Sequence, residues 1–345
     1  MAAAATATEE GELGLDSQVG GRLLGKGVFG CTFDPAPRCA GGKVFKEIGG
    51  MPAVGKVTVE DAADELEIGR IIMALPLAKQ YFALPSAGCV PATPFDDPDV
   101  KKCGILTDRG EKTTLSMLLM PAGGMPLSRV VESDKAWAAA NFVRTFVHLL
   151  EGMEIYQGAG IVHNDIHDGN ILVDRRGVAR FIDYGLGFQL AKVRAWEDAN
   201  LGRTFKPKYV WTPPEIHAMR MYFGGISTEA GVAELFRINA DYGALERMFP
   251  KRMRCVDALK RFMTSRIGGV QMIQEYGKRF DWWRIGFCMY VVWSELIAWS
   301  GFWETPVYRA QRDTVLRVIS GMTEWDPRLR WRPTEALEVL RPLLT

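Results

Sequence analysis

Three polar residues between positions 163 and 185 could act on a phosphorylated substrate. Asp165 lies in HNDIHDGNILVD, Asn170 follows five residues later, and Asp183 lies in FIDYG. A carboxylate such as Asp165 can receive or orient the proton of an attacking hydroxyl, so we predict that it is the catalytic base. Carboxamide and carboxylate oxygens are ligands that Mg²⁺ prefers, which makes Asn170 and Asp183 the predicted metal ligands. The pattern predicts phosphoryl transfer with ATP and Mg²⁺ as cofactors.

The same residues resemble two motifs of the protein kinases, the catalytic loop H-R-D-L-x-x-x-N and the tripeptide D-F-G, with Tyr184 in place of Phe. A glycine-rich turn, GKGVFG, stands where the resemblance requires a loop over the phosphates, between the apolar runs GRLLG and CTF. Glycine lets a backbone come close to phosphate oxygens. A dinucleotide fold would instead need a helix after the turn, but a strand-like run follows. The predicted nucleotide contacts here are Gly25, Lys26, Gly27, Val28, Phe29 and Gly30.

The resemblance also implies a strand lysine that holds the phosphates and a helix glutamate that holds the lysine. Lys46, in GGKVFKEI, is predicted to be that lysine, although a lysine there could also be merely solvent-exposed. The amphipathic segment 59–75 is predicted to be the helix. Within it Glu65 is the preferred partner of the lysine because Leu66, Ile68 and Ile72 then form a buried stripe. Glu67 remains an alternative.

Three later segments resemble further kinase landmarks in the expected order. WTPPEIH resembles the A-P-E segment and contains Glu215, and FDWWRIG resembles the start of the large C-terminal helix and contains Asp281. WDPRLRWRP resembles the last conserved segment and contains Arg330. The resemblance implies that Asp281 accepts hydrogen bonds from the catalytic-loop backbone. It also implies that Arg330 forms a buried ion pair with Glu215.

The fold implied by the resemblance is α+β and bilobal, with a small antiparallel β-rich lobe carrying one helix and a larger, mostly helical lobe. We expect a disordered tail at 1–15, the first lobe at 16–121 and the second at 122–345. Met120 and Ala122, at the predicted hinge, are expected to lie near the adenine. An insert at about 218–278 separates Glu215 from Asp281. It is predicted to be a solvated helix pair that pads the lobe, with docking of a partner as the alternative.

The composition is that of a soluble globular protein. The chain has 345 residues, 48% hydrophobic and 24% charged, and a net charge of +1, which offers no argument for nucleic-acid or membrane binding. Its six cysteines form no C-x-x-C pair, so we predict reduced thiols in a cytoplasmic or host-cell intracellular protein that is not secreted. The apolar run 285–299 contains Glu295 and is predicted to be a buried helix, not a transmembrane segment.

Two substitutions depart from the kinase pattern. Asn164 replaces the arginine of H-R-D, so we predict an activity that does not depend on phosphorylation of the activation loop, for example at Thr204. His167 replaces the lysine of Ser/Thr kinases, and D-x-H-x-G-N resembles aminoglycoside and choline kinases instead.

The function implied is transfer of the γ-phosphate of ATP to Ser/Thr hydroxyls of a protein substrate, in a chain similar to Ser/Thr kinases of large DNA viruses. The alternatives are a small-molecule phosphotransferase and a pseudokinase scaffold. The scaffold is disfavoured because Lys46, Asp165, Asn170 and Asp183 are all present.

Overall fold

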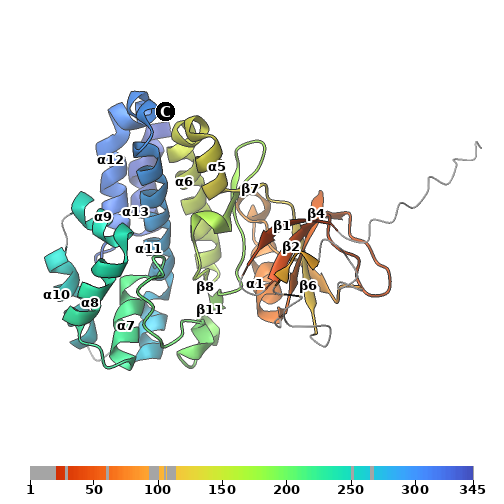
Figure 1. Ribbon diagram of the computed structural model, residues 1–345, viewed down its shortest axis with the longest axis horizontal. Coiled ribbons are helices and arrows are strands. Elements are labelled where there is room, and N and C mark those ends of the chain that lie inside the picture. Colours follow the sequence, from red (N-terminus) through yellow and green to blue (C-terminus); the bar gives the residue numbers. More distant parts are fainter. Residues whose placement is uncertain are drawn as a thin grey trace, which may run out of the picture.

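The computed structural model describes residues 21–27, 30–59, 62–92, 101–104, 106, 114–249, 252–264 and 268–344. A β-rich lobe lies beside a helical lobe (Figure 1), which together form the expected α+β bilobal fold. We call them the N-lobe and the C-lobe. The predicted tail at 1–15 and two predicted loop residues, Val28 and Phe29, lie outside the described residues.

The N-lobe is built on an antiparallel sheet in which the strands follow the order β1-β2-β4-β6-β5, and β3 pairs with β4. In the part of the chain that the structure describes, helices α1 and α2 accompany it. The elements are β1 (Arg22–Lys26), β2 (Gly30–Asp34), β3 (Glu47–Ile48), β4 (Met51–Thr58), α1 (Ala63–Met73), α2 (Ala78–Tyr81), β5 (Ala87–Cys89) and β6 (Ser116–Pro121).

Strand β4 is the centre of this sheet, because it pairs with β2 on one side and with β6 on the other. Side chains alternate between the two faces of a strand. Val57 joins the apolar cluster of Cys31 and Phe33, whereas Val54 joins the cluster of Ala62 and Leu118. An even-numbered residue of β4 therefore points to the face on which α1 begins.

Helix α1 has the amphipathic pattern that the sequence predicts. Its buried residues are Glu65, Ile68, Gly69 and Ile72. A Cβ at Gly69 would lie 2.2 Å from the carbonyl oxygen of Pro85, so the close approach of the helix to the 82–86 segment requires glycine there. The burial of Glu65 on this apolar face calls for a cationic partner.

The C-lobe is mainly helical, and its helices pack around α11 (Figure 1). The apolar run 285–299 forms the second half of α11 and is largely buried, as the sequence predicts. Among the described helices, none combines the length and the apolarity that crossing a bilayer would need. The main helices are α5 (Leu127–Ser133), α6 (Lys135–Gly158), α7 (Pro214–Phe223), α8 (Thr228–Ile238), α9 (Ala240–Met248), α10 (Arg252–Thr264), α11 (Gly269–Ile297), α12 (Pro306–Met322) and α13 (Pro333–Leu340).

Short strands and short 3₁₀ helices form much of the chain between these helices. The strands form two small sheets, β10-β9-β7 and β11-β8. The elements are β7 (Met125–Pro126), β8 (Ile161–Val162), η2 (Asp168–Asn170), β9 (Ile171–Val173), β10 (Ala179–Phe181), β11 (Phe188–Gln189), η3 (Leu190–Lys192), η4 (Glu197–Ala199), η5 (Ser300–Glu304) and η6 (Arg341–Leu344).

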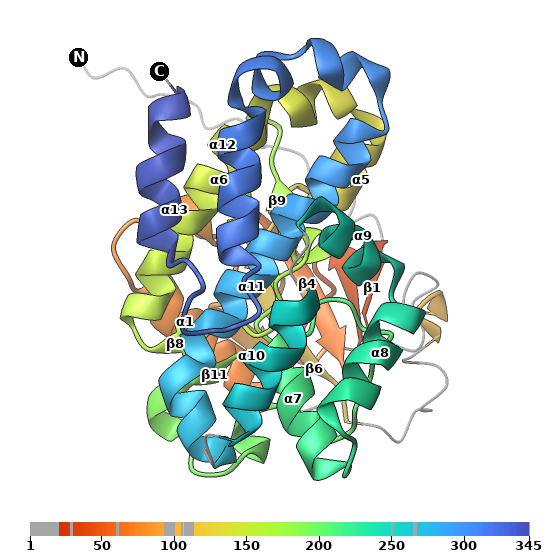
Figure 2. The same cartoon turned by 90° about the vertical axis from the view of Figure 1, so that its left-hand side faces the viewer.

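The expected insert is helical. Helices α8, α9 and α10 occupy it and gather with α7 on one side of the C-lobe (Figure 2). Helix α10 packs against α7 and α8, and Lys260 on α10 forms an ion pair with Glu229 on α8. These contacts favour a padding role over a free docking surface.

The prediction of six reduced thiols is wrong for four of them. Cys31 on β2 is bonded to Cys103, and Cys39 is bonded to Cys89 on β5. The partners are 72 and 50 residues apart in sequence, so no short spacing pattern indicates the pairs. Only the folding of the sheet brings them together. Cys255 and Cys288 are buried and form no disulfide.

Candidate active site

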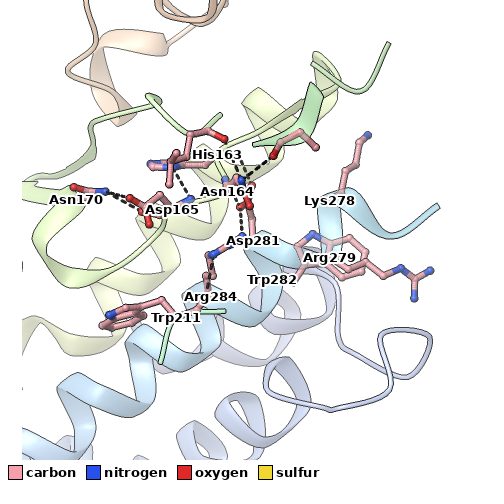
Figure 3. Close-up of polar contacts among 12 residues, drawn as sticks. His163, Asn164, Asp165, Asn170, Trp211, Lys278, Arg279, Asp281, Trp282 and Arg284 are labelled. Carbon is pink, nitrogen blue, oxygen red and sulfur yellow. Dashed lines mark hydrogen bonds and ion pairs between the residues drawn. The ribbon is translucent and has the colours of Figure 1, made fainter. Parts of the chain in front are cut away.

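The buried carboxylate of Asp281 on α11 anchors the loop that carries Asp165. Asp281 accepts hydrogen bonds from the backbone amides of His163 and Asn164, at 2.8 and 2.9 Å (Figure 3). The hydroxyl of Tyr156 on α6 donates a third, at 2.9 Å. This is the role expected for Asp281. Because two of these three donors are backbone amides of the loop, the buried carboxylate fixes the loop on helix α11.

Asp165 and Asn170 lie next to each other at the end of this loop. The carboxamide nitrogen of Asn170 donates to the carbonyl oxygen of Asp165 at 2.9 Å and to its Oδ2 at 3.2 Å (Figure 3). With the nitrogen engaged in this way, Oδ1 of Asn170 is the atom left for a cation. The backbone amide of Ile182 donates to the carbonyl of Asn170 at 3.1 Å, which ties the strand leading to Asp183 to the same loop.

Asp183 is joined to the N-lobe through a lysine that bridges two carboxylates. Nζ of Lys56 on β4 lies 2.8 Å from Oδ1 of Asp183 and 3.0 and 2.9 Å from the two oxygens of Glu65. The lysine side chain is 17% exposed and Glu65 is 8% exposed. The ammonium group of Lys56 thus connects the two lobes. It joins β4, the central strand of the sheet, to helix α1 and to the segment after β10.

The expectation that Lys46 fills this position is wrong. Lys46 is exposed and precedes β3, and its carbonyl accepts a hydrogen bond from the amide of Ala53. The strand next to the glycine-rich hairpin in the sheet is β4. Lys46 lies outside it, because the chain first forms the short β3–β4 turn, with Gly49 and Gly50 at positive φ, and only then enters the part of β4 that pairs with β2. An available signal was the alternating run AVGKVT at 53–58, which places a lysine inside an apolar strand nine residues before Glu65.

Glu65 rather than Glu67 is the helix glutamate that lies against a lysine of the sheet, but that lysine is Lys56 and not the predicted Lys46. Glu65 contacts Lys56, whereas Glu67 is exposed and pairs with Lys192 at 2.6 Å. Phase on α1 explains the difference, since Glu65 shares the buried face with Ile68 and Ile72.

Electrostatics keep this lysine charged. Burial alone would lower the pKa of Lys56, but the adjacent carboxylates of Asp183 and Glu65 raise it above its usual value. Burial opposes ionisation of Asp183 as well, yet the charge and hydrogen bond of Lys56 hold the pKa of Asp183 below its usual value. For Glu65 burial dominates and raises the pKa. The lowered pKa of Asp183 favours its ionised form, which suits a metal ligand.

The donor set of Asn170 and Asp183 fits Mg²⁺. Both offer hard oxygen atoms, and Mg²⁺ is commonly bound by one or two such side chains together with substrate phosphates and water. Among the described residues no group of three or more His, Cys, Asp or Glu side chains is arranged to hold a metal ion. A cation at this site would accordingly depend on phosphate oxygens to complete its ligands.

The glycine-rich turn closes the hairpin β1–β2, with the amide of Gly27 donating to the carbonyl of Gly30 at 2.8 Å. A Cβ at Gly30 would lie 2.0 Å from the carbonyl oxygen of Val57, so this position requires glycine to pack on β4. A Cβ at Gly25 would meet no atom within 4 Å, which leaves open space at that glycine. Met120 is buried near the end of β6 beside Val54, and the nucleotide contacts expected of it, of Ala122 and of Lys26 stay predictions.

Comparison with known proteins agrees with this geometry. Residues 100–225 match the family model described as protein kinase domain, a stretch that includes Asp165, Asn170 and Asp183. The fold is that of a protein kinase. Its N-lobe lysine lies outside the matched stretch, so the position of Lys56 comes from the structure.

Individual relatives are similar over about a third of the chain. Mitogen-activated protein kinase kinase kinase 2 of Arabidopsis thaliana is 33% identical over 107 residues, which are 31% of this chain and 16% of the relative. Sperm motility kinase 2B of Mus musculus is 32% identical over 125 residues, 35% of this chain and 24% of the relative. Serine/threonine kinase NLK of Caenorhabditis briggsae is 26% identical over 121 residues, 34% of this chain and 17% of the relative. The chain thus matches less than a quarter of the length of each of these kinases.

The C-lobe contains the expected buried ion pair. The guanidinium of Arg330 donates two hydrogen bonds to Glu215, at 2.7 and 2.8 Å, and both side chains are 0% exposed. The bidentate pair connects α7, at the end of the activation segment, to the segment before α13.

Asn164 uses its side chain differently from an arginine in the same place. Its carboxamide nitrogen donates to the carbonyl oxygens of Leu186 and Ala199, at 3.1 and 3.2 Å. Two points of the activation segment are thereby attached to the catalytic loop by neutral hydrogen bonds, and neither bond needs a phosphate.

His167 lies beside the catalytic carboxylate. Its Nδ1 accepts a hydrogen bond from the amide of Gly169, and its Nε2 is 3.9 Å from Oδ2 of Asp165. Its ring lies next to Trp211, with centroids 5.6 Å apart. Tyr184, in the position of the D-F-G phenylalanine, is buried against His163, with 4.1 Å between ring centroids.

Proposed function

We propose that this chain is an ATP-dependent protein kinase that transfers the γ-phosphate to Ser/Thr hydroxyls of protein substrates. The observation that supports it best is the joint contact of Lys56 with Glu65 and Asp183, next to the loop of Asp165 and Asn170. These residues come from four separate segments, and their convergence is what phosphoryl transfer needs.

Each residue has a distinct task in this mechanism. Asp165 orients the acceptor hydroxyl and receives its proton as the oxygen forms its bond to phosphorus. Lys56 binds the phosphates with a charge that its two carboxylates maintain, and the glycine-rich turn covers them. Asn170 and Asp183 would hold Mg²⁺, which neutralises charge on the phosphates when bound.

The main alternative is a small-molecule phosphotransferase of the aminoglycoside or choline type. His167 supports it, since the imidazole stands beside Asp165 where Ser/Thr kinases place a lysine. The pair Glu215–Arg330 and the support of the catalytic loop by Asp281 support the protein kinase. A pseudokinase scaffold is disfavoured because the lysine, the base and both metal ligands occupy one site.

Transfer from labelled ATP to generic proteins, aminoglycosides and choline tests the proposal. We expect incorporation into protein Ser/Thr, and Asp165→Asn should reduce it by about 10²–10⁴-fold because the proton acceptor is lost. A thermal melt of the variant controls for folding. Exclusive labelling of a small molecule would favour the alternative, and undiminished turnover of Asp165→Asn would remove Asp165 from its role.

A further inference from the structure

The two central strands of the N-lobe lead away from the phosphate lysine in two directions. Lys56 on β4 pairs with Leu118 on β6. In one direction β4 ends at Thr58, which pairs with Gly30 of the turn expected to cover the phosphates. In the other direction β6 ends at Pro121, three residues beyond Leu118 and about 10 Å along the strand. A nucleotide whose phosphates contact Lys56 therefore directs its base toward Pro121.

Apolar side chains of both lobes flank this end of β6. Val54 on β4 pairs with Met120 on β6, and both belong to one buried cluster against which Ala122 packs. From the C-lobe, Leu172 on β9 comes so close that a Cβ on Gly123 would lie 2.5 Å from its Cδ1. Every base has an apolar face, so such surfaces hold a base without selecting it. Selection between bases requires hydrogen bonds at the edge of the ring.

The backbone at this end of β6 has an acceptor for the base and lacks a donor. Pro121 has no N–H, and the amide of Ala122 donates to the carbonyl of Pro52 at 2.8 Å. Ala53 is the partner of Pro121 in the register of the two strands, but its amide donates to the carbonyl of Lys46 at 3.0 Å. Strand β4 therefore leaves the carbonyl oxygen of Pro121 available.

We propose, on the basis of the kinase activity above, that Pro121 determines how this site selects its nucleotide. Adenine presents a donor, the amino group on C6, beside an acceptor, the ring nitrogen N1. The carbonyl of Pro121 accepts from the amino group, and N1 receives no hydrogen bond from Pro121 or Ala122. The site thus recognises a purine by its 6-amino group and is indifferent to the atom at ring position 1.

The register of the strands explains why proline is tolerated here and what its removal would do. Because Ala53 and Pro121 exchange no hydrogen bond, proline removes no bond from the sheet. The N–H and C=O groups of one residue in an antiparallel strand point to the same side. Alanine at position 121 would accordingly add an N–H beside the carbonyl that accepts from the base.

The test measures nucleotide binding to the full chain with Mg²⁺ by isothermal titration calorimetry. The nucleotides are ATP, 1-deaza-ATP, in which C–H replaces N1, and purine riboside triphosphate, which lacks the 6-amino group. We expect the wild type to bind 1-deaza-ATP within about twofold of ATP, because N1 has no donor to lose. Purine riboside triphosphate should bind about fivefold more weakly, the scale of one hydrogen bond.

Two proline variants sharpen the comparison. Pro121→Ala should bind ATP about fivefold more tightly than 1-deaza-ATP, because the new amide donates to N1. Pro52→Ala is the matched control, since it also adds an amide, but on β4 and facing Ala122 rather than the base. Its ratio of the two dissociation constants should stay at the wild-type value.

The outcomes separate this proposal from the proposed function. A wild type that binds 1-deaza-ATP about fivefold more weakly than ATP would show that a donor contacts N1, and would overturn this proposal alone. The same holds if a folded Pro121→Ala, checked by thermal melt, keeps the wild-type ratio. The wild-type comparison decides by itself if that variant does not fold. Absence of ATP binding would overturn the proposed function.

Discussion

The two lobes of this protein are stabilised by different means. The N-lobe has two small apolar clusters on opposite faces of one sheet and two disulfides that connect its strands to distant loops. The C-lobe has one continuous core, rich in aromatic side chains, which extends to Ile68 and Ile72 of α1, and it has a buried ion pair. A small sheet buries too little apolar surface to be rigid by packing alone, so cross-links contribute there what packing contributes in the C-lobe. The active site joins the two through Lys56.

The largest expected loss of stability comes from breaking the C-lobe ion pair. Arg330→Met would leave Glu215 as a fully buried carboxylate without its guanidinium, which typically costs about 3–5 kcal/mol. The free energy of unfolding from urea titration measures it. Exchange of the exposed Arg332 for Met is the matched control, with an effect below about 0.5 kcal/mol. An equal and small loss in both variants would show that packing alone holds this region.

The N-lobe should respond to loss of a covalent link. Replacement of Cys31 and Cys103 by Ala removes a link across 72 residues and should destabilise the protein by about 2–4 kcal/mol. Hydrogen exchange should place the loss in β1, β2 and β4, with the C-lobe amides unchanged. The double change of the buried thiols Cys255 and Cys288 to Ala removes no disulfide, so its loss should fall in C-lobe amides instead. If the N-lobe amides exchanged equally slowly with and without the disulfide, the N-lobe would not depend on its cross-links.

Lys56 tests how the lobes cooperate. Lys56→Met should lower kcat/KM by about 100-fold or more, because the phosphates lose a preorganised charge. It should also lower the melting temperature, because the buried Glu65 loses its cationic partner. Lys46→Met, at the exposed lysine, should stay within about twofold of the wild type. Phosphate transfer to a generic protein measures both. If Lys46→Met lowered kcat/KM more than Lys56→Met, Lys46 would be the phosphate-binding lysine, as the sequence predicts.

The same contrast explains what the sequence could predict. In the C-lobe, Asp165 and Asn170 belong to one continuous motif, and Asp281, Glu215 and Arg330 lie in short segments with their own signatures. Their positions could be read locally, and the observed contacts of Asp281 and Arg330 agree.

In the N-lobe the decisive pairings are non-local. Lys56 could not be separated from Lys46 without knowing that the chain forms the extra β3–β4 turn, and the partner of each cysteine depends on the order of strands in the sheet. Glu65 was the exception because helical periodicity, a local signal, distinguishes it from Glu67. The hydrogen bond from the Tyr209 hydroxyl to Asp165 had no sequence signal, since it depends on the path of the activation segment.

The smallest expected effect concerns a loop residue of the C-lobe. Asn164 attaches the activation segment through the carbonyls of Leu186 and Ala199, so the attachment does not depend on a phosphate at Thr204. Thr204→Ala should therefore keep kcat/KM within about twofold, as for other exposed positions. Asn164→Ala, by contrast, removes both hydrogen bonds and should loosen the segment in hydrogen exchange. Suppose that Thr204→Ala lost its activity while the amides of the activation segment stayed protected. Activity would then depend on a modification of Thr204, and the neutral hydrogen bonds of Asn164 would not be sufficient to hold the active arrangement.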